Sequence, residues 1–366
     1  MNNCYDDVPL DKWNDWHWQM ANRITRVTQL EKKLPLDTQT KNDIQKCLLN
    51  FRMSITPYYL SLINSNNVND PIRKQCIPTI EETYCDVNDL EDPLNEVKDS
   101  PVENIVHRYP DRVLFLVTMH CSMYCRHCTR RRVVGETDTI ISEKQLQTGL
   151  NYIRNHQEIR DVLISGGDPL VMSTNKLEHI ISQIRAIKHV EIIRIGTRVP
   201  VVLPMRINDN LLRMLKKYQP IWINTHFNHP NEITLDASIA CKKIVDAGIP
   251  LGNQTVLLKG INNDVNIMKT LLLNLVKNRV RPYYLYQCDL SVGIGHFRTN
   301  VDEGIDIMHQ LRGFISGYAL PVFVIDAPKG GGKIPVSYNY VISKNTKEVV
   351  LENYLGKKYT YPQPKK

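Results

Sequence analysis

The 366-residue chain contains no apolar run of the length that a membrane span needs. Its first residues, MNNCYDDVPLDKW, have neither a basic start nor an apolar signal core, so we expect no secretory leader. There is no internal repeat beyond a strand–helix alternation, and no low-complexity segment apart from a short glycine run near residue 330. These absences argue against a membrane protein and a repeat protein, and they favour a globular cytoplasmic one.

The cysteine pattern excludes two common uses of this residue. The chain has 9 cysteines, an odd number, and six of them are scattered singly, which fits a disulfide framework poorly. No second C-x2-C pair exists to complete a structural zinc site with four ligands. Free thiols suit a reducing compartment, and we expect the cytoplasm.

Charge is spread rather than concentrated. The sequence has 46 Lys and Arg against 38 Asp and Glu, for a net charge of +8, but the signs are mixed along the chain. The main exceptions are Arg130–Arg132 and the C-terminal tail, so we expect no nucleic-acid partner. A basic protein that handles an anionic cofactor explains the excess at least as well. At 42% hydrophobic residues, the chain can form one barrel-sized domain with additions, or two domains.

Three cysteines, Cys121, Cys125 and Cys128, stand together after an apolar run, in the spacing C-x3-C-x2-C. Closely spaced soft thiolates suit an iron–sulfur cluster. A cubane cluster has four irons, so three cysteines leave one iron open to a small molecule. Zinc and chance clustering are the alternatives, and His127 between the last two cysteines points elsewhere if all three face one metal.

From about residue 113 the sequence alternates short apolar runs with longer amphipathic stretches. Strands are expected at 113–120, 161–169, 191–199, 220–227, 250–258 and 281–289, and later at 321–328. Helices are expected at 143–156, 175–187, 208–218, 234–248 and 266–278, and finally at 302–316. Six strand–helix units in series predict an α/β fold with a parallel sheet that curls into a full or partial barrel.

Polar residues gather where the predicted strands end. At strand ends they are the three cysteines, Ser165-Gly166-Gly167-Asp168, Arg198, His226 and Cys288-Asp289, and Gln254 lies within the strand predicted at 250–258. In barrels of this type the active site forms at the carboxyl ends of the strands, so this convergence predicts a site. Residues 1–106 differ, with a predicted helix at 10–34 whose Trp13, Trp16 and Trp18 are expected to pack against the barrel or a second subunit.

A second piece of chemistry centres on Lys333, which follows three glycines. The segment is not a phosphate-binding Walker loop, because Ile334 replaces the required Ser or Thr and Ala327 replaces the first glycine. A lysine on a flexible arm can form an imine with an aldehyde cofactor such as pyridoxal phosphate, although a surface turn is the simpler alternative. In the upstream HRYPDR segment, Arg108 and Arg112 offer guanidinium groups for a phosphate, and Tyr109 is available to the ring.

Several strings together resemble one family. They are RYPDRVL, CSMYCRHCTRRR, SGGDPL, NTHFNHP, NQTVLLKG, YLYQCDLSVGIGHFRT and DAPKGGGKIPV. They resemble, in the same order, motifs of the lysine 2,3-aminomutases, which are radical S-adenosylmethionine enzymes that also use pyridoxal phosphate. The resemblance runs from about residue 100 to 350, whereas the related enzymes that lysylate elongation factor P have a less similar cysteine segment.

The resemblance implies a partial (β/α)6 TIM-like barrel at 107–320, an N-terminal helical region at 1–106 and a C-terminal segment at 321–366. It implies a [4Fe–4S] cluster on the three cysteines and S-adenosylmethionine on Ser165, Gly166, Gly167, Asp168, His226 and Gln254. It implies that Lys333 bonds pyridoxal phosphate, with Arg108, Tyr109 and Arg112 as further contacts. For the substrate, it implies that Arg130 binds the α-carboxylate and that Asp289 and Asp326 meet the far ammonium group of lysine.

The implied reaction converts L-lysine to β-lysine by way of a pyridoxal phosphate aldimine and a 5′-deoxyadenosyl radical. Two carboxylates in a closed pocket repel each other unless a cation lies between them, so Asp289 and Asp326 would select a substrate with a positive far end. The alternative for this pair is that the two aspartates cap turns or bind arginines. An electron donor such as flavodoxin or ferredoxin and a homodimer are further expectations.

The chain departs from the family pattern at two places. No cysteine follows Cys288, and Asp264 stands where a fourth zinc ligand would be, so we expect no structural zinc. Lys329 stands where the family commonly has glycine, and its cation either pairs with Asp326 or faces solvent. Arginine as substrate, a radical enzyme without pyridoxal phosphate and a non-catalytic iron–sulfur protein remain the alternatives.

Overall fold

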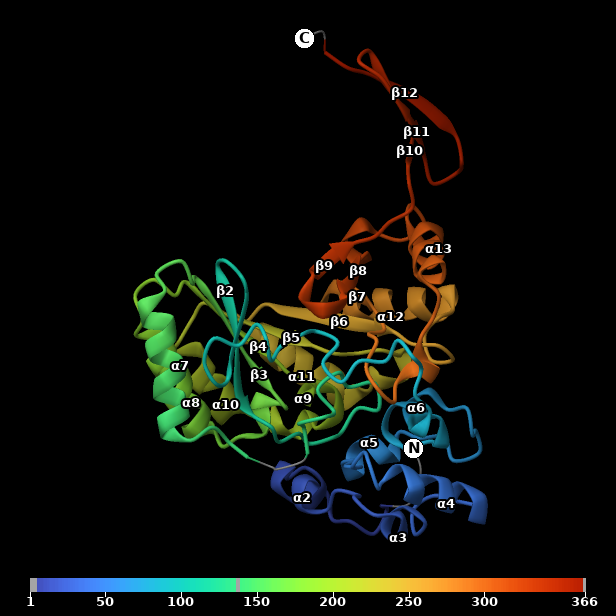
Figure 1. Ribbon diagram of the computed structural model, residues 1–366. Coiled ribbons are helices and arrows are strands. Elements are labelled where there is room, and N and C mark those ends of the chain that lie inside the picture. The colour runs from blue at the N-terminus through green and yellow to red at the C-terminus, as the bar shows by residue number, and fades with distance from the viewer. Residues whose placement is uncertain (1–4, 136–138, 365–366) are drawn as a thin grey trace.

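A curved sheet dominates the computed structural model, which describes residues 5–135 and 139–364 (Figure 1). In this part of the chain, nine strands form the sheet in sequence order. They are β1 (Ile105–Tyr109), β2 (Arg112–Thr118), β3 (Asp161–Gly166), β4 (Ile192–Gly196), β5 (Ile221–Thr225), β6 (Leu251–Leu257), β7 (Arg281–Gln287), β8 (Val322–Ala327) and β9 (Gly332–Pro335). Strands β2 to β8 are parallel, and β1 and β9 flank them as antiparallel edge strands.

Helices connect the parallel strands and cover the outer face of the sheet, as predicted (Figure 1). They are α7 (Glu143–Asn155), α8 (Thr174–Arg185), α10 (Asp209–Lys216), α11 (Leu235–Asp246) and α12 (Val265–Lys277), with the short α9 (Val199–Val202) after β4. Each of the five longer helices begins at a polar residue whose side chain accepts a backbone hydrogen bond of the first turn, as Ser142 does for α7. The apolar stripes of these helices pack on the strands, which gives the partial α/β barrel that the periodicity predicts.

Side chains along each strand point alternately to the two faces of the sheet, so one face forms the core and the other lines the interior of the barrel. In β3, Val162 and Ile164 are fully buried under the helices, whereas Leu163 and Ser165 face the interior of the barrel and line a cavity. The two edge strands approach each other where the backbone N–H of Lys333 in β9 donates to Tyr109 Oη in β1, at 2.9 Å. The interior of the barrel is therefore available to functional side chains.

The N-terminal region corrects one expectation. Residues 10–34 form three short helices, α1 (Leu10–Trp13), α2 (Trp16–Ala21) and α3 (Val27–Leu30), instead of one long helix. The side chain of Asp15 accepts from the His17 N–H and starts a new helix, and Ile24 then forms a β-bridge with Ile55. Helices α4 (Thr38–Cys47), α5 (Pro57–Ser61) and α6 (Pro71–Cys76) follow.

The predicted packing of the tryptophans against the barrel is seen for one of them. The Trp16 ring lies under the guanidinium of Arg206, whose carbon is 4.7 Å from the ring centroid. Arg206 ends a 3-10 turn, η3 (Pro204–Arg206), on the barrel side. Figure 1 shows the N-terminal helices gathered beneath the barrel.

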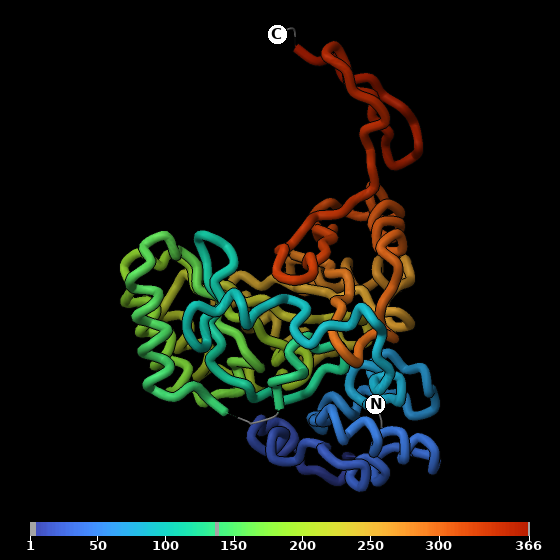
Figure 2. The backbone as a smooth tube through the Cα atoms, in the orientation of Figure 1, coloured from blue at the N-terminus to red at the C-terminus, as the bar shows by residue number. Residues whose placement is uncertain are grey.

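The C-terminal region adds an element that the sequence did not indicate. Helix α13 (Val301–Leu311) ends five residues before the predicted boundary, because the chain turns at Gly313, whose φ is +86°. After β9, strands β10 (Val341–Lys344), β11 (Glu348–Glu352) and β12 (Lys358–Pro362) form a separate antiparallel sheet. This C-terminal arm, residues 341–362, projects away from the barrel, as the tube in Figure 2 shows.

Within residues 5–135 and 139–364, no helix combines the length and apolar character required to cross a membrane. The division into parts at residues 106 and 320 stays a prediction.

Candidate active site

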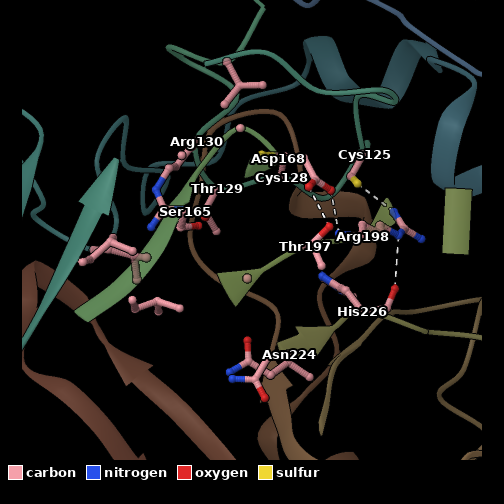
Figure 3. Close-up of a pocket in the computed structure, with 18 of the residues that line it drawn as sticks. Cys125, Cys128, Thr129, Arg130, Ser165, Asp168, Thr197, Arg198, Asn224 and His226 are labelled. Atoms are coloured by element: carbon pink, nitrogen blue, oxygen red, sulfur yellow. Dashed lines mark hydrogen bonds between the residues drawn. The ribbon is translucent and has the colours of Figure 1, made fainter. Parts of the chain in front are cut away.

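A cavity of about 670 Å³ opens inside the barrel, and Figure 3 shows part of its wall. Every site residue predicted from the sequence lines it: Arg108, Tyr109, Arg112, Cys121, Cys125, Cys128, Arg130, Ser165, Gly166, Gly167, Asp168, His226, Gln254, Asp289, Asp326 and Lys333. These residues come from elements that span residues 105–335, and the fold gathers them at one place. Their assigned roles stay predictions.

The three cysteines lie in the loop after β2, and all three are partly exposed and line the cavity. Burial, and then the nearby Cys125, raise the pKa of Cys128. Three soft donors from one short loop, with the Arg198 guanidinium 2.7 Å from Cys125 Sγ, fit an iron–sulfur cluster. Among the described residues no set of three Cys, His, Asp or Glu side chains is grouped to hold a single metal ion, whereas a cubane cluster binds each thiolate at a different iron.

The cysteine loop is held by the N-terminal region, a role that the sequence did not reveal. The Tyr124 N–H donates to the Ser54 carbonyl, and the Arg23 guanidinium donates to the Cys121 carbonyl at 2.7 Å. The Arg126 N–H donates to the Gln75 carbonyl at 3.0 Å. Residues upstream of the barrel therefore position the loop by hydrogen bonds to its backbone.

The Ser165–Asp168 segment passes unusually close to the cysteine loop. A Cβ on Gly166 would lie 2.0 Å from the Thr118 carbonyl oxygen, and the φ of this residue is +127°, so only glycine fits. Asp168 is buried, and its carboxylate accepts from Thr197 Oγ1 at 2.6 Å and from the Arg198 N–H at 2.7 Å. Burial raises the pKa of Asp168 to about 6. Asp168 therefore fixes the segment to β4 and α9 as well as lining the cavity.

His226 directly follows β5, and Gln254 lies in the middle of β6. His226 Nε2 is 3.1 Å from Asn228 Oδ1, and burial lowers the pKa of His226 to about 3, so its ring is neutral near pH 7. Gln254 lies in β6 with its side chain partly exposed to the cavity. Both can donate or accept hydrogen bonds from a nucleoside without contributing charge.

Lys333 is placed by the antiparallel pairing of β8 with β9, where it stands opposite Asp326. Its Nζ lies 3.1 and 3.2 Å from the two carboxylate oxygens of Asp326, and 5.4 Å from the centroid of the Tyr286 ring. A lysine on an edge strand beside glycines of positive φ, with an aromatic ring nearby, fits a pyridoxal phosphate site.

The two arginines predicted for the phosphate currently contact carboxylates. Arg108 Nε donates to Asp99 at 2.7 Å and its Nη2 donates to the Leu94 carbonyl, whereas Arg112 pairs with Asp111 at 2.7 Å. The guanidinium carbon of Arg112 also lies 4.0 Å from the centroid of the Tyr109 ring. Both guanidinium groups therefore face the place proposed for the phosphate and already bind carboxylate oxygens.

Arg130 has a partner that the sequence reasoning missed. Its Nε lies 3.0 and 2.9 Å from the two carboxylate oxygens of Glu96, and its Nη2 lies 2.6 Å from one of them. Glu96 is buried, and despite its burial the charge of Arg130 lowers its pKa. A guanidinium that binds one carboxylate in this forked manner is suited to bind a second one at its free edge.

Asp289 and Asp326 face the cavity together. Burial, and then the charge of Asp326, raise the pKa of Asp289 to about 7. Asp326 pairs with Lys333 instead of with an arginine, which argues against the simple structural role considered for it from the sequence. Two adjacent carboxylates of which one is partly protonated form a site that favours a cation.

The barrel and its cysteine loop define the class of protein. Residues 115–271 match the model of the Radical SAM superfamily, and residues 308–366 match the Lysine-2,3-aminomutase model. The chain is 56% identical over 360 residues to the L-lysine 2,3-aminomutase of Acetoanaerobium sticklandii, which covers 98% of this chain and 87% of that protein. It belongs to the lysine 2,3-aminomutase family, and the predicted family is confirmed.

Two further relatives are named for different amino acid substrates. The L-lysine 2,3-aminomutase of Bacillus subtilis is 52% identical over 360 residues, covering 98% of this chain and 76% of that protein. The Glutamate 2,3-aminomutase of Clostridioides difficile is 48% identical over 347 residues, covering 95% of this chain and 82% of that protein. Family membership makes the protein an isomerase whose cofactors are a [4Fe–4S] cluster, S-adenosylmethionine and pyridoxal phosphate, as predicted.

Proposed function

We propose that the protein moves the α-amino group of L-lysine to the β-carbon and so produces β-lysine. The observation that carries this proposal is the pair Asp289 and Asp326, which lines the same cavity as Arg130 and Lys333. Such a cavity offers a guanidinium cation from Arg130 and two carboxylates from Asp289 and Asp326. This arrangement complements a free amino acid with a positive side chain and disfavours glutamate.

The chain's own residues hold the reacting partners. Cys121, Cys125 and Cys128 would bind the cluster, and the segment Ser165–Asp168 with His226 and Gln254 would bind S-adenosylmethionine. Lys333, Arg108, Tyr109 and Arg112 would bind pyridoxal phosphate. When bound, these groups supply a 5′-deoxyadenosyl radical that removes and returns a hydrogen atom, and a ring system that carries the migrating nitrogen.

Substrate binding would exchange ion pairs that exist in the free protein. Arg130 binds the α-carboxylate at the guanidinium edge that Glu96 leaves free. Lys333 would hold the aldehyde cofactor through its Nζ, and Asp326, which pairs with that nitrogen in the free protein, would then be available to the ammonium group of the substrate. Asp289 releases its proton as the cation arrives, because an adjacent positive charge lowers a carboxyl pKa.

We also propose an electron donor, a cellular compartment and an oligomeric state for the protein. A one-electron donor such as flavodoxin or ferredoxin reduces the cluster. The free cysteines outside the cluster loop, Cys47, Cys76, Cys85, Cys241 and Cys288, are consistent with a reducing compartment such as the cytoplasm. A homodimer is supported by apolar side chains exposed on the C-terminal arm, Val341, Tyr359 and Tyr361 among them.

The decisive experiment is anaerobic incubation of the purified protein with reductant, both organic cofactors and a panel of α-amino acids, scored for β-amino acid products. Lysine should be converted, glutamate should not, and the variant Asp326→Asn should lose most of the lysine activity. Arginine is the competing cationic substrate, and faster conversion of arginine than of lysine would reassign the substrate. If neither changes while S-adenosylmethionine is cleaved, the proposed substrate class is wrong.

The variant Lys333→Ala tests the cofactor lysine. The wild-type protein with pyridoxal phosphate should show the absorption band of a lysine-bound aldehyde, and the variant should not. A band that persists unchanged in the variant would assign the bond to another lysine.

A further inference from the structure

Arg198, which none of the predicted roles includes, contacts one of the three cysteines from the core of the protein. It lies between β4 and α9 with an exposed fraction of 7%, and its Nη1 donates to Cys125 Sγ at 2.7 Å. Figure 3 shows this contact, together with the hydrogen bond from Arg198 Nε to the His226 carbonyl at 3.2 Å. The sulfur therefore accepts a charge-assisted hydrogen bond from a buried donor.

The rest of the guanidinium is held rigidly. Its Nη2 donates to Glu232 at 2.7 Å and to Gln75 Oε1 at 2.6 Å. Glu232 is fully buried and also accepts from Tyr59 Oη at 2.7 Å and from the Asn228 N–H at 2.6 Å. Because every edge of the guanidinium is bound, the N–H group that faces Cys125 cannot easily turn away.

We propose that Arg198 is a positioning residue for the iron–sulfur cluster, whose N–H group holds the Cys125 sulfur and raises the cluster's reduction potential. This inference rests on the proposed role of Cys125 as a ligand. A hydrogen bond withdraws electron density from a ligating thiolate, so it stabilises the reduced cluster, which carries one more negative charge. The effect is favoured because the donor is buried, so little water competes for its N–H group.

The position of Glu232 helps to distinguish the effect of the N–H···S hydrogen bond from the effect of the positive charge of Arg198. The carboxylate lies against the same guanidinium, so the Arg198–Glu232 pair is neutral as a whole. The direct N–H···S contact is then the main influence of Arg198 on the sulfur. The electron itself comes from the external donor, and Arg198 only makes its acceptance more favourable.

Two variants test this without leaving a buried charge unpaired. Arg198→Lys keeps a cation beside Glu232 but lacks the planar fork that reaches the sulfur and the carboxylate at once. The double variant R198Q/E232Q keeps the site neutral and polar. The matched control is Arg206→Lys, because Arg206 is also a buried arginine, with 1% exposed, and donates to the Leu170 and Met172 carbonyls at 2.8 and 3.0 Å.

The readout is an anaerobic redox titration of the full chain with reconstituted cluster, followed by electron paramagnetic resonance without S-adenosylmethionine or amino acid. At a fixed potential, the ratio of reduced to oxidised cluster should fall about tenfold in both Arg198 variants, which corresponds to a midpoint about 59 mV lower. Arg206→Lys should match the wild type. Equal midpoints in all four proteins would overturn the inference.

A second measurement needs no variant to fold. Wild-type protein labelled with ¹⁵N-arginine should show a weak ¹⁵N coupling to the reduced cluster in pulsed resonance spectra, and absence of the coupling would overturn the inference. A wild-type protein that assembles no [4Fe–4S] cluster would contradict the proposed function itself. Normal assembly with an unchanged midpoint would contradict only the role of Arg198.

Discussion

At the scale of single residues, Asp289 carries the most informative ionisation. Burial and the neighbouring Asp326 raise its pKa to about 7 in the folded protein, whereas an unfolded chain has a value near 3.9. Between about pH 4 and pH 7 the folded state therefore binds more protons than the unfolded state. Asp289 therefore contributes most to the free energy of unfolding below pH 4, and this contribution is lost as the pH rises to about 7.

The variant Asp289→Asn removes this titration. In the cofactor-free protein we expect the stability of the variant, relative to the wild type, to increase from pH 4 to pH 7 and then to level off. The gain should be up to about 4 kcal/mol, measured by urea unfolding across that range. A stability difference for Asp289→Asn that does not vary with pH would contradict the assignment.

Lys329 is a second residue whose setting yields a prediction. Its φ is +62°, and its backbone contacts Pro93 and Asn95, while its side chain is exposed. Because Asp326 pairs with Lys333, the structure favours the solvent-facing alternative for the Lys329 cation. Lys329→Gly should therefore stabilise the protein by up to about 1 kcal/mol by relieving the left-handed conformation.

Lys329→Ala is the control, because alanine removes the charge but keeps the strained backbone, and it should give no gain in thermal unfolding. The preference for lysine over arginine should be the same in both variants. A change of substrate preference in Lys329→Ala would instead bring this cation into the site.

At the scale of elements, Asp264 has a role that its place in the family pattern did not suggest. It is the N-cap of α12, and its carboxylate accepts from the N–H groups of Asn266 and Ile267 at 2.9 and 3.0 Å. We expect Asp264→Ala to lower the free energy of unfolding by about 1 kcal/mol, and Asp264→Asn to cost little, because asparagine is an equally good cap. Chemical denaturation measures both, and equal losses in the two variants would contradict a capping role.

Helices and strands could be predicted wherever apolar residues recurred at a regular spacing along the sequence. From residue 113 the strands and helices follow the sequence closely, since buried strands and amphipathic helices leave clear apolar patterns. The helix expected over residues 10–34 was wrong, because caps at single residues such as Asp15 and tertiary pairing of Ile24 decide the local structure there. The C-terminal arm was also missed, because strands with mixed and exposed side chains give little periodic signal.

The residues of the candidate site likewise fall into those that could be recognised from the sequence and those that could not. Groups that react, such as the three cysteines and Lys333, are recognisable because their chemistry requires particular residues at particular spacings. Groups that only hold them are not, because their partners are distant in sequence: Glu96 is 34 residues from Arg130, and Gln75 is 123 residues from Arg198. Such pairings become visible only when the fold brings the segments together.

At the scale of the whole molecule, the distribution of cysteines argues against a structural zinc ion. Apart from the cluster loop, the described cysteines are Cys47, Cys76, Cys85, Cys241 and Cys288, of which all but Cys85 are buried. A zinc site needs four ligands, and Asp264 is occupied as a helix cap. Metal analysis of the reconstituted protein should find iron but less than stoichiometric zinc, and one zinc per chain would refute this.

The assembly of the molecule should depend on one face of the C-terminal arm. Strand pairing places Val341 opposite Leu351 and Leu351 opposite Tyr359, with Val349 opposite Tyr361 on the same face. Tyr359 and Tyr361 are 55% and 65% exposed. A three-stranded sheet of this size has no core of its own, so covering this face with a second copy would remove apolar surface from water.

Tyr361→Glu should convert the proposed dimer to monomer in sedimentation experiments, because a charge on the covered face must be desolvated. Thr360→Glu places the same charge on the opposite face of β12 and should leave the dimer intact. Both substitutions lie far along the chain from the cysteine loop, so both variants should still assemble the cluster. If both proteins remain dimeric, the subunits meet elsewhere and the arm face has another role; if the wild type is itself a monomer, the proposed dimer is wrong.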